Sequence, residues 1–364
     1  DRCLGCRACE QVCPAGVEYG QLLEASREVL LESQPKSDLS NRLLRFVLRH
    51  VWLSPTRLRL FFAASRWFRD LGLARMLLKT GVAKLISPRA EFGVALLESS
   101  KDISHAKTPP RKERRKGAAE RVLLFKGCVG EGLFARVNRA TERVLEANDF
   151  NVEIPSRQVC CGALHAHAGD LEGARELARR NIAAFDSDAP IITNAGGCGA
   201  MLTTYAHLLA NDESLAERAM KFSARVRDVS QQLATTEMRT APAPVDKNVT
   251  YDTSCHLMYG QGSGEASERM LRSVTGKDFV ALNGTERCCG AAGVYNLLQP
   301  EMSQRVLSEK LGHIKETGAG ILATGNPGCQ MHIGAGACLS GMKLRVCHPI
   351  EIVDQAYETA GYYE

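Results

Sequence analysis

Four cysteines near the start of the chain have a spacing that suits redox chemistry. Cys3, Cys6, Cys9 and Cys13 form a C-x2-C-x2-C-x3-C run, and a proline follows directly. This is the ferredoxin-type spacing, in which three thiolates on one curled loop reach three irons of a [4Fe–4S] cluster and the fourth ligates a neighbouring cluster. The run therefore predicts an iron–sulfur site, with a zinc site or four free thiols as the alternatives.

A single run of this kind is incomplete. The cluster of Cys3, Cys6 and Cys9 lacks a fourth ligand, and Cys13 lacks a cluster of its own. We therefore expect a second ferredoxin-type motif upstream of Asp1, where the chain begins without Met, and two [4Fe–4S] clusters in all.

Eight further cysteines indicate that the second half of the chain is duplicated. Each copy has one cysteine, then a Cys-Cys-Gly tripeptide, then a last cysteine. The two groups are Cys128, Cys160, Cys161 and Cys198, and Cys255, Cys288, Cys289 and Cys329. Equivalent cysteines are 127, 128 and 131 residues apart, which predicts two copies of one domain of roughly 110–130 residues.

The four thiols of each copy could hold an iron–sulfur cluster or a zinc ion. The alternative is that they are buried packing residues or a duplicated remnant. Adjacent cysteines are poorly suited to a mutual disulfide, because such a bridge strains the backbone. His165, His167 and His256 could donate hydrogen bonds to bound thiolates, although an ordinary structural role is the simpler interpretation. Cys338 and Cys347 have no counterpart in the first copy and are expected to be unligated.

The composition is that of a large globular protein, with 364 residues, 45% hydrophobic and 24% charged. Its 14 cysteines, without a signal peptide or a run of about 18 apolar residues, favour a reducing compartment and metal-bound thiolates. We therefore expect a cytoplasmic protein.

The elements that must position these cysteines follow from the pattern along the chain. From Glu120 onward, short apolar strands, cysteine-bearing turns and helices alternate, which predicts α/β domains with mostly parallel sheets. In such sheets, ligands bind at the carboxyl ends of the strands, where these cysteines fall. We predict a mixed α+β and α/β chain in five regions: a helical ferredoxin-like module over 1–37, a basic helical segment over 38–100, a linker over 101–119, and cysteine-rich domains over 120–240 and 241–364.

Several motifs resemble the iron–sulfur subunit family of glycolate oxidase (glycolate dehydrogenase). They are DRCLGCRACEQVCPAGVEYGQLLE, LFKGCV, QVCCGALHAHAGD, NAGGCGAML, RCCGAAGVYNLLQPEMS and NPGCQMHI. Related subunits of lactate-utilisation, anaerobic glycerol-3-phosphate dehydrogenase and heterodisulfide reductase systems share the ferredoxin motif and the Cys-Cys-Gly domains. The run CCGAAGVYNLLQPEMS favours glycolate oxidase among them.

The resemblance implies a subunit that carries electrons from flavin-binding partners, which oxidise glycolate to glyoxylate, toward a membrane quinone. It also implies the upstream ferredoxin motif. The chain departs from the wider Cys-Cys-Gly pattern, which usually ends each repeat in C-x2-C, because Ala195 and Asn326 replace the first cysteine of that pair. Each repeat therefore has four candidate ligands, which argues against a catalytic non-cubane cluster.

The basic helical segment is the other unusual feature. Between Ser40 and Ala90 there are eleven Lys or Arg residues and one acidic residue, Asp70, and both tryptophans lie there. Such a segment suits an anionic membrane surface, on which the protein would be peripheral at the inner face, or an acidic partner subunit. A solvated face over an ordinary core is the simpler alternative. No nucleic-acid motif accompanies the charge, so no nucleic-acid partner is expected.

No catalytic residues are predicted, because the sequence has no evident nucleophile–base pair and no Gly-rich phosphate loop. Two rival functions remain open. One is a cluster enzyme with direct thiol–disulfide chemistry, and the other is a zinc-binding assembly scaffold whose repeats are structural.

Overall fold

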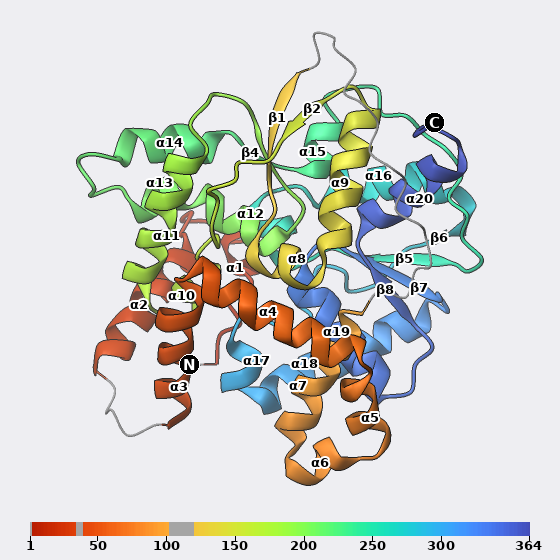
Figure 1. Cartoon of the computed structure of the whole chain (residues 1–364), viewed down its shortest axis with the longest axis horizontal. Helices are drawn as coiled ribbons and strands as arrows, with labels where there is room; N and C mark the ends of the chain where they lie inside the picture. The colour runs from red at the N-terminus through yellow and green to blue at the C-terminus, as the bar shows by residue number, and fades with distance from the viewer. Residues whose placement is uncertain (1, 34–38, 102–119) are drawn as a thin grey trace.

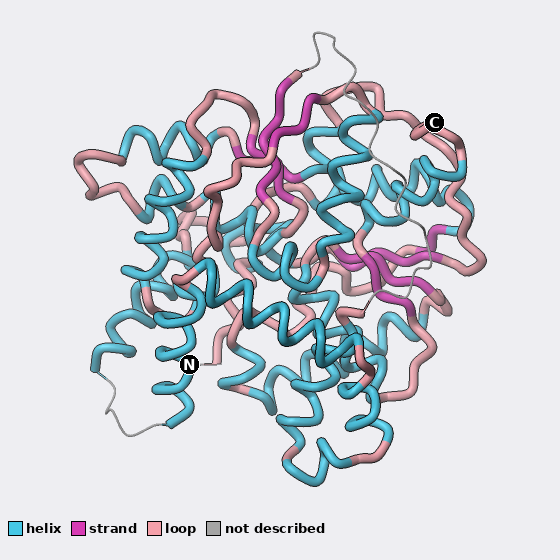
Figure 2. Tube along the Cα trace, in the orientation of Figure 1, coloured by secondary structure: helices cyan, strands magenta, loops and turns pink. Residues whose placement is uncertain are grey.

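The computed structural model describes residues 2–33, 39–101 and 120–364 (Figure 1). Most of the expected linker over 101–119 therefore lies outside the described residues. The secondary structure is mixed helix and parallel sheet, in two repeats preceded by a helical region, as the sequence predicts (Figure 2).

The first repeat contains a parallel sheet of four strands in the order β2-β1-β3-β4. Its elements are β1 (Arg121–Phe125), α8 (Cys128–Leu133), α9 (Ala135–Ala147), β2 (Asn151–Glu153), α10 (Ala163–His167), α11 (Leu171–Ala184), β3 (Ile191–Thr193), α12 (Gly196–Thr203), α13 (Tyr205–Leu208), α14 (Ala216–Ala224), β4 (Val226–Asp228) and α15 (Val229–Leu233). In register, Leu123 of β1 pairs with Ile191 of β3.

The second repeat has the same topology, with a parallel sheet in the order β6-β5-β7-β8. Its elements are β5 (Val249–Asp252), η2 (His256–Gly260), α16 (Gly264–Thr275), η3 (Gly276–Asp278), β6 (Phe279–Val280), α17 (Tyr295–Leu298), α18 (Pro300–Glu316), β7 (Ile321–Thr324), α19 (Pro327–Leu339), β8 (Arg345–Cys347) and α20 (Pro349–Thr359). The shared strand order supports the predicted duplication.

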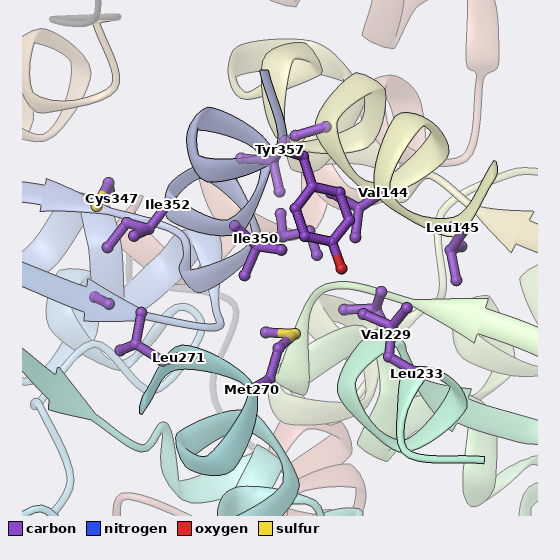
Figure 3. Packing of buried hydrophobic residues seen from close by; sticks show 14 of the residues in the cluster. Val144, Leu145, Val229, Leu233, Met270, Leu271, Cys347, Ile350, Ile352 and Tyr357 are labelled. Atoms are coloured by element: carbon purple, nitrogen blue, oxygen red, sulfur yellow. The ribbon is translucent and has the colours of Figure 1, made fainter. Parts of the chain in front are cut away.

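One hydrophobic core joins the two repeats. The central strands are buried on both faces, and alternate residues face opposite sides of the sheet. In β1, Val122 and Leu124 face the shared core, whereas Leu123 and Phe125 face a separate core of the first repeat. Figure 3 shows the shared core where α9, α15, α16 and α20 meet.

The helix that ends each repeat packs on the first long helix of the other repeat. α20 of the second repeat contacts α9 of the first, and α15 of the first contacts α16 of the second. Two ion pairs reinforce the α9–α20 contact, from Arg136 to Glu351 at 2.7 Å and from Arg143 to Asp354 at 2.5 Å. The repeats are thereby held in one fixed arrangement.

The region before the repeats is helical. Its elements are α1 (Ala8–Gln11), α2 (Tyr19–Ser33), α3 (Leu39–Val47), η1 (Leu48–Trp52), α4 (Pro55–Asp70), α5 (Leu73–Lys79), α6 (Val82–Ile86) and α7 (Pro88–Ser99). Ser54 caps α4 by accepting a hydrogen bond from Arg57 N, and Pro55 is the first residue of that helix. Gly72 and Gly81 adopt left-handed conformations at φ 78° and 72° and separate α4, α5 and α6.

α7 attaches this region to the second repeat by packing along α19. Ser99 Oγ donates to the carbonyl of Met331 at 3.0 Å, and the rings of Phe92 and His332 lie 5.2 Å apart. No helix among the described residues is long and apolar enough to cross a membrane.

Candidate metal centres

The sheet topology explains why the cysteines of each repeat meet. β1 and β3 are adjacent, but the chain leaves them toward opposite neighbours, so their carboxyl ends form a topological switch point. Cys128 follows β1, and Cys198 lies in the first turn of α12, just after β3. The Cys-Cys-Gly tripeptide follows the edge strand β2 and ends at the same edge of the sheet.

The four thiols of the first repeat form one chain of contacts, which we call the first cysteine group. Cys128 Sγ lies 3.2 Å from Cys160 Sγ, and Cys161 Sγ lies 3.5 Å from Cys198 Sγ. Contact with Cys160 and burial raise the pKa of Cys128 well above its usual range, although the indole of Trp52 opposes this effect.

The second cysteine group has the same arrangement in the second repeat. Cys255 Sγ lies 3.9 Å from Cys288 Sγ, and Cys289 Sγ lies 3.1 Å from Cys329 Sγ. Hydrogen bonds from Cys255 and Cys289 hold the pKa of Cys288 well below its usual range. In each repeat, the structure therefore brings together the four cysteines that the sequence singles out.

The glycine of each tripeptide adopts a positive φ, which favours glycine over other residues. Gly162 has a φ of 92° and Gly290 a φ of 94°. A Cβ atom on Gly290 would lie 2.7 Å from the carbonyl oxygen of Ser303, and one on Gly162 would lie 3.3 Å from Cα of Ala174. A side chain at either position is therefore disfavoured by the backbone and, at Gly290, by a clash.

The N-terminal cysteine loop (residues 2–13) lies against the second cysteine group. His256, directly after Cys255, has Nε2 3.1 Å from the carbonyl oxygen of Gly5. The Tyr295 hydroxyl donates to the carbonyl of Arg2 at 2.9 Å. Burial raises the pKa of Cys6, and the thiol of Cys288 beside it raises that pKa further.

Arg27 and a histidine pair complete this junction between the loop and both repeats. The Arg27 guanidinium donates to the carbonyls of Cys3 and His167, at 2.9 and 3.0 Å. The rings of His167 and His256 lie 5.2 Å apart, and Glu24 Oε1 lies 3.0 Å from Nδ1 of His167. Burial, together with His167, lowers the pKa of His256 to about 4, so its ring is neutral at pH 7 and donates to the loop.

Within the loop, one cysteine is set apart from the others. Cys3 and Cys9 are close enough to Cys6 to raise its pKa. The Cys13 sulfur instead faces its own following turn, where the backbone N–H groups of Val17 and Ala15 lower its pKa. The expectation that Cys13 serves a different cluster from the other three stays a prediction.

The remaining predicted residues have structural roles. His165 is fully buried, with Nδ1 2.9 Å from Asp170 Oδ2. Cys338 is exposed on α19 and Cys347 is buried in β8, and among the described residues neither sulfur contacts a sulfur of a cysteine group.

A buried ion pair lies under the second cysteine group. Lys310 Nζ is 2.6 Å from Asp252 Oδ1, and each side chain is 1% exposed. Lys310 also donates to the carbonyl of Gly284 at 2.7 Å. At the equivalent positions, the first repeat has Phe125 and Asn181.

The two cysteine groups are also joined directly. Gly196 N donates to the carbonyl of Gly325 at 2.9 Å, and Gly197 N donates to Asn326 Oδ1 at 3.1 Å. The amide of Asn326 in turn donates to Cys329 Sγ at 3.4 Å. Asn326 therefore replaces the missing cysteine of the wider pattern with a hydrogen-bond donor to a neighbouring sulfur.

Comparison with known proteins agrees with this architecture. Residues 122–203 and 249–334 each match the cysteine-rich domain family called CCG. A probable glycolate oxidase iron–sulfur subunit of Bacillus subtilis is 36% identical over 370 residues, which cover 99% of this chain and 82% of the relative. The chain belongs to the family of glycolate oxidase iron–sulfur subunits.

Other relatives support the same assignment. The glycolate oxidase iron–sulfur subunit of Escherichia coli is 30% identical, over 98% of this chain and 82% of the relative. The lactate utilization protein A of Oceanobacillus iheyensis is 33% identical over 235 residues, which cover 64% of this chain and 96% of the relative. The resemblance and the repeated cysteine-rich domains expected from the sequence are confirmed.

Iron–sulfur clusters are held by cysteine thiolates, and the thiols of each cysteine group fit this chemistry. Each group presents four thiols, in contacts of 3.1–3.9 Å, at one edge of a sheet. No group of three or more Cys, His, Asp or Glu side chains in the described residues has the arrangement of ligands around a single metal ion. The ligand role of all twelve cysteines therefore stays a prediction.

Sequence reasoning missed the residues that connect the groups. Arg27, Tyr295 and Lys310 were not singled out. Each of the three donates to a backbone carbonyl, and such a contact leaves no side-chain pattern in the sequence. His256 was singled out only as a donor to thiolates, and its partner proves to be the carbonyl of Gly5.

Proposed function

We propose that this chain is the electron-transfer subunit of a complex that oxidises glycolate to glyoxylate. The observation that carries the proposal is the position of the N-terminal cysteine loop against the second repeat, where His256, the neighbour of Cys255, contacts the carbonyl of Gly5 at 3.1 Å. Two redox sites of one chain need such proximity to exchange electrons. The family membership supports the glycolate substrate, which a flavin-binding partner would oxidise.

In this proposal the N-terminal cysteine loop would hold [4Fe–4S] clusters through Cys3, Cys6, Cys9 and Cys13, completed by a motif upstream of Asp1. The two cysteine groups would hold further clusters or zinc. A bound cluster would supply reversible one-electron chemistry. We infer that electrons enter from the flavin partner at the loop and leave toward a membrane quinone.

The chain's own residues would position and insulate these sites. His256, neutral and buried, holds the loop through its donation to Gly5 rather than through a charge. Arg27 fastens the loop to the first repeat at His167. Asn326 donates to Cys329, and such hydrogen bonds to sulfur favour the reduced, more negative state of a cluster.

The test is metal and sulfide analysis of anaerobically purified full-length protein, with EPR of the dithionite-reduced form. About eight irons with matching sulfide indicate two ferredoxin clusters alone, and more than eight place clusters in the repeats as well. Little iron with stoichiometric zinc overturns the electron-transfer proposal and favours the zinc scaffold.

Matched cysteine variants assign the sites. Cys6→Ser and Cys289→Ser are expected to lower iron and sulfide, whereas Cys338→Ser, an exposed cysteine outside both groups, should leave them unchanged. If all three variants keep the full iron content, the assignment is wrong.

One observation favours thiol–disulfide chemistry as a second candidate. The sulfurs of Cys255 and Cys288 lie 3.9 Å apart, and hydrogen bonds from Cys255 and Cys289 lower the pKa of Cys288, which favours its thiolate form. Disulfide reductase activity of the purified protein that is lost in Cys288→Ser would support this candidate.

A further inference from the structure

The exposed apolar side chains of the chain are concentrated before the repeats. Of the twenty large apolar side chains that are exposed among the described residues, sixteen lie between Val12 and Ile86. The most exposed of all is Leu85, at 86%, and its neighbour Ile86 is 72% exposed. Such a concentration on one part of a chain is typical of a surface that another body covers.

Leu85 and Ile86 belong to a protruding helical segment, which we call the apolar tip (residues 71–90). The tip comprises α5, α6 and the start of α7, and Figure 1 shows α6 at the end of the molecule remote from both sheets. Its exposed apolar side chains are Leu71, Met76, Val82, Leu85 and Ile86.

The tip is a fixed surface rather than a loose loop. On its inner side, Ala74 and Ala83 are buried, at 0% and 1% exposure, where α5 and α6 pack against α7. Ser87 caps α7 by accepting from Ala90 N at 3.0 Å, and Pro88 is the first residue of that helix. The backbone therefore holds Leu85 and Ile86 outward.

The charge of the tip is of one sign. Residues 71–90 contain four cations and no acidic residue. Arg75 pairs with Glu98 at 2.9 Å. Lys79, Lys84 and Arg89 are exposed, and no ion pair of theirs is found among the described residues. The apolar tip therefore has exposed apolar side chains with cations around them. This pattern matches a bilayer, because anionic headgroups attract the cations and the acyl region accepts the apolar groups.

We propose that the apolar tip docks the subunit on an anionic phospholipid surface, with Leu85 and Ile86 inserted at the headgroup level. The inference rests on the proposed function, in which electrons leave toward a membrane quinone, and names the surface that brings the chain there. A protein partner would also cover apolar groups. However, a convex tip with unpaired cations fits a flat anionic surface better than a groove in another subunit.

The test is flotation of the full-length protein with vesicles of phosphatidylcholine alone or of phosphatidylcholine with about one third phosphatidylglycerol, at about 0.1 M salt. We expect binding to the anionic vesicles and at least ten-fold weaker binding to the zwitterionic ones. Leu85→Ser/Ile86→Ser should weaken the anionic binding at least ten-fold, and Lys79→Glu/Lys84→Glu at least twenty-fold, since each cation near such a surface contributes about five-fold.

Matched controls are available on the opposite part of the molecule. Met220→Ser changes a side chain that is 57% exposed on α14, and Lys277→Glu reverses an exposed charge on η3. Neither should change the binding. All four variants alter exposed positions, so thermal unfolding should show that each remains folded.

The outcomes separate this inference from the proposed function. Flotation requires no cluster, so it can succeed even if iron analysis overturns electron transfer. If the wild-type protein does not float with anionic vesicles, or if the tip variants float as well as the controls do, the inference is wrong. Loss of a partner subunit from the Leu85→Ser/Ile86→Ser variant, with vesicle binding intact, would also overturn it and assign the tip to a protein interface.

Discussion

Replacement of Lys310 by methionine should strongly destabilise the second repeat. Lys310 and Asp252 are each 1% exposed, so the variant leaves a carboxylate buried without its counter-ion. Breaking a buried pair from one side costs about 3–5 kcal/mol, because the remaining charge is uncompensated. With a urea m-value of about 2 kcal/mol/M for a domain of this size, the unfolding midpoint should fall by about 2 M.

The pH dependence of this loss has a defined sign. Burial raises the pKa of Asp252 even in the presence of Lys310, and loss of the lysine must raise it further. A native state that holds a proton more tightly than the unfolded state becomes more stable as the pH falls. The deficit of Lys310→Met should therefore be largest at pH 8 and shrink as the pH falls through the raised pKa of Asp252.

Urea unfolding followed by circular dichroism measures both effects, with two further variants as references. Lys310→Met/Asp252→Leu removes both charges and should recover most of the lost stability. Lys221→Met breaks an exposed pair with Glu217, at 69% and 75% exposure, and should shift the midpoint by no more than about 0.3 M. The reasoning is refuted if Lys310→Met behaves like Lys221→Met, or if the double variant is no more stable than the single one.

Three further predictions follow from local geometry. Gly290→Ala should destabilise the protein by more than about 2 kcal/mol in thermal unfolding, because the new Cβ would clash with Ser303. Gly262 also has a positive φ but open space around it, so Gly262→Ala should cost about 1 kcal/mol. Equal costs for the two variants would contradict the clash. His348, whose pKa burial lowers to about 4, donates from Nε2 to the Asn194 carbonyl and accepts from Ile350 N. Stability should therefore fall between pH 6.5 and 4 by up to about 3 kcal/mol, and His348→Asn should flatten that part of a urea titration. Asn326→Ala should cost about 1–3 kcal/mol, because it leaves Gly197 N unpaired, and an unchanged melting temperature would show that this hydrogen bond is not formed.

The parts of the fold that depend on local patterns could be predicted from the sequence. Ser54-Pro55 marks a helix start because a cap and a fixed φ act within one turn, and Gly72 and Gly81 mark helix ends for a similarly local reason. The cysteine spacing revealed the duplication, and the strand–turn–helix order placed the cysteines at one edge of each sheet.

The shared core and the buried ion pair could not be predicted in the same way. The helical pattern of α20 shows that one face is apolar, but not that this face packs on α9 of the other repeat. Lys310 lies within the polar sequence SEKLGH and looks like a surface residue, since its partner Asp252 is 58 positions away.

The position of the N-terminal cysteine loop against the second repeat could not be predicted from the sequence, for a related reason. Its contacts join residues about 250 to 290 positions apart, and they use backbone carbonyls as acceptors. Any residue type supplies a carbonyl, so the composition of the loop carries no trace of where it binds.

Among the described residues, the hydrogen bonds that the repeats make directly to this loop come from the second copy of the duplicated domain. The loop is held by His256 and Tyr295 of the second repeat, and Val129 occupies the position of His256 in the first. The two repeats are therefore not equivalent in their contacts with the N-terminal cysteine loop. A chain that carried the first half twice would keep the strand order but would lack His256 and Tyr295, the two side chains that hold the N-terminal cysteine loop.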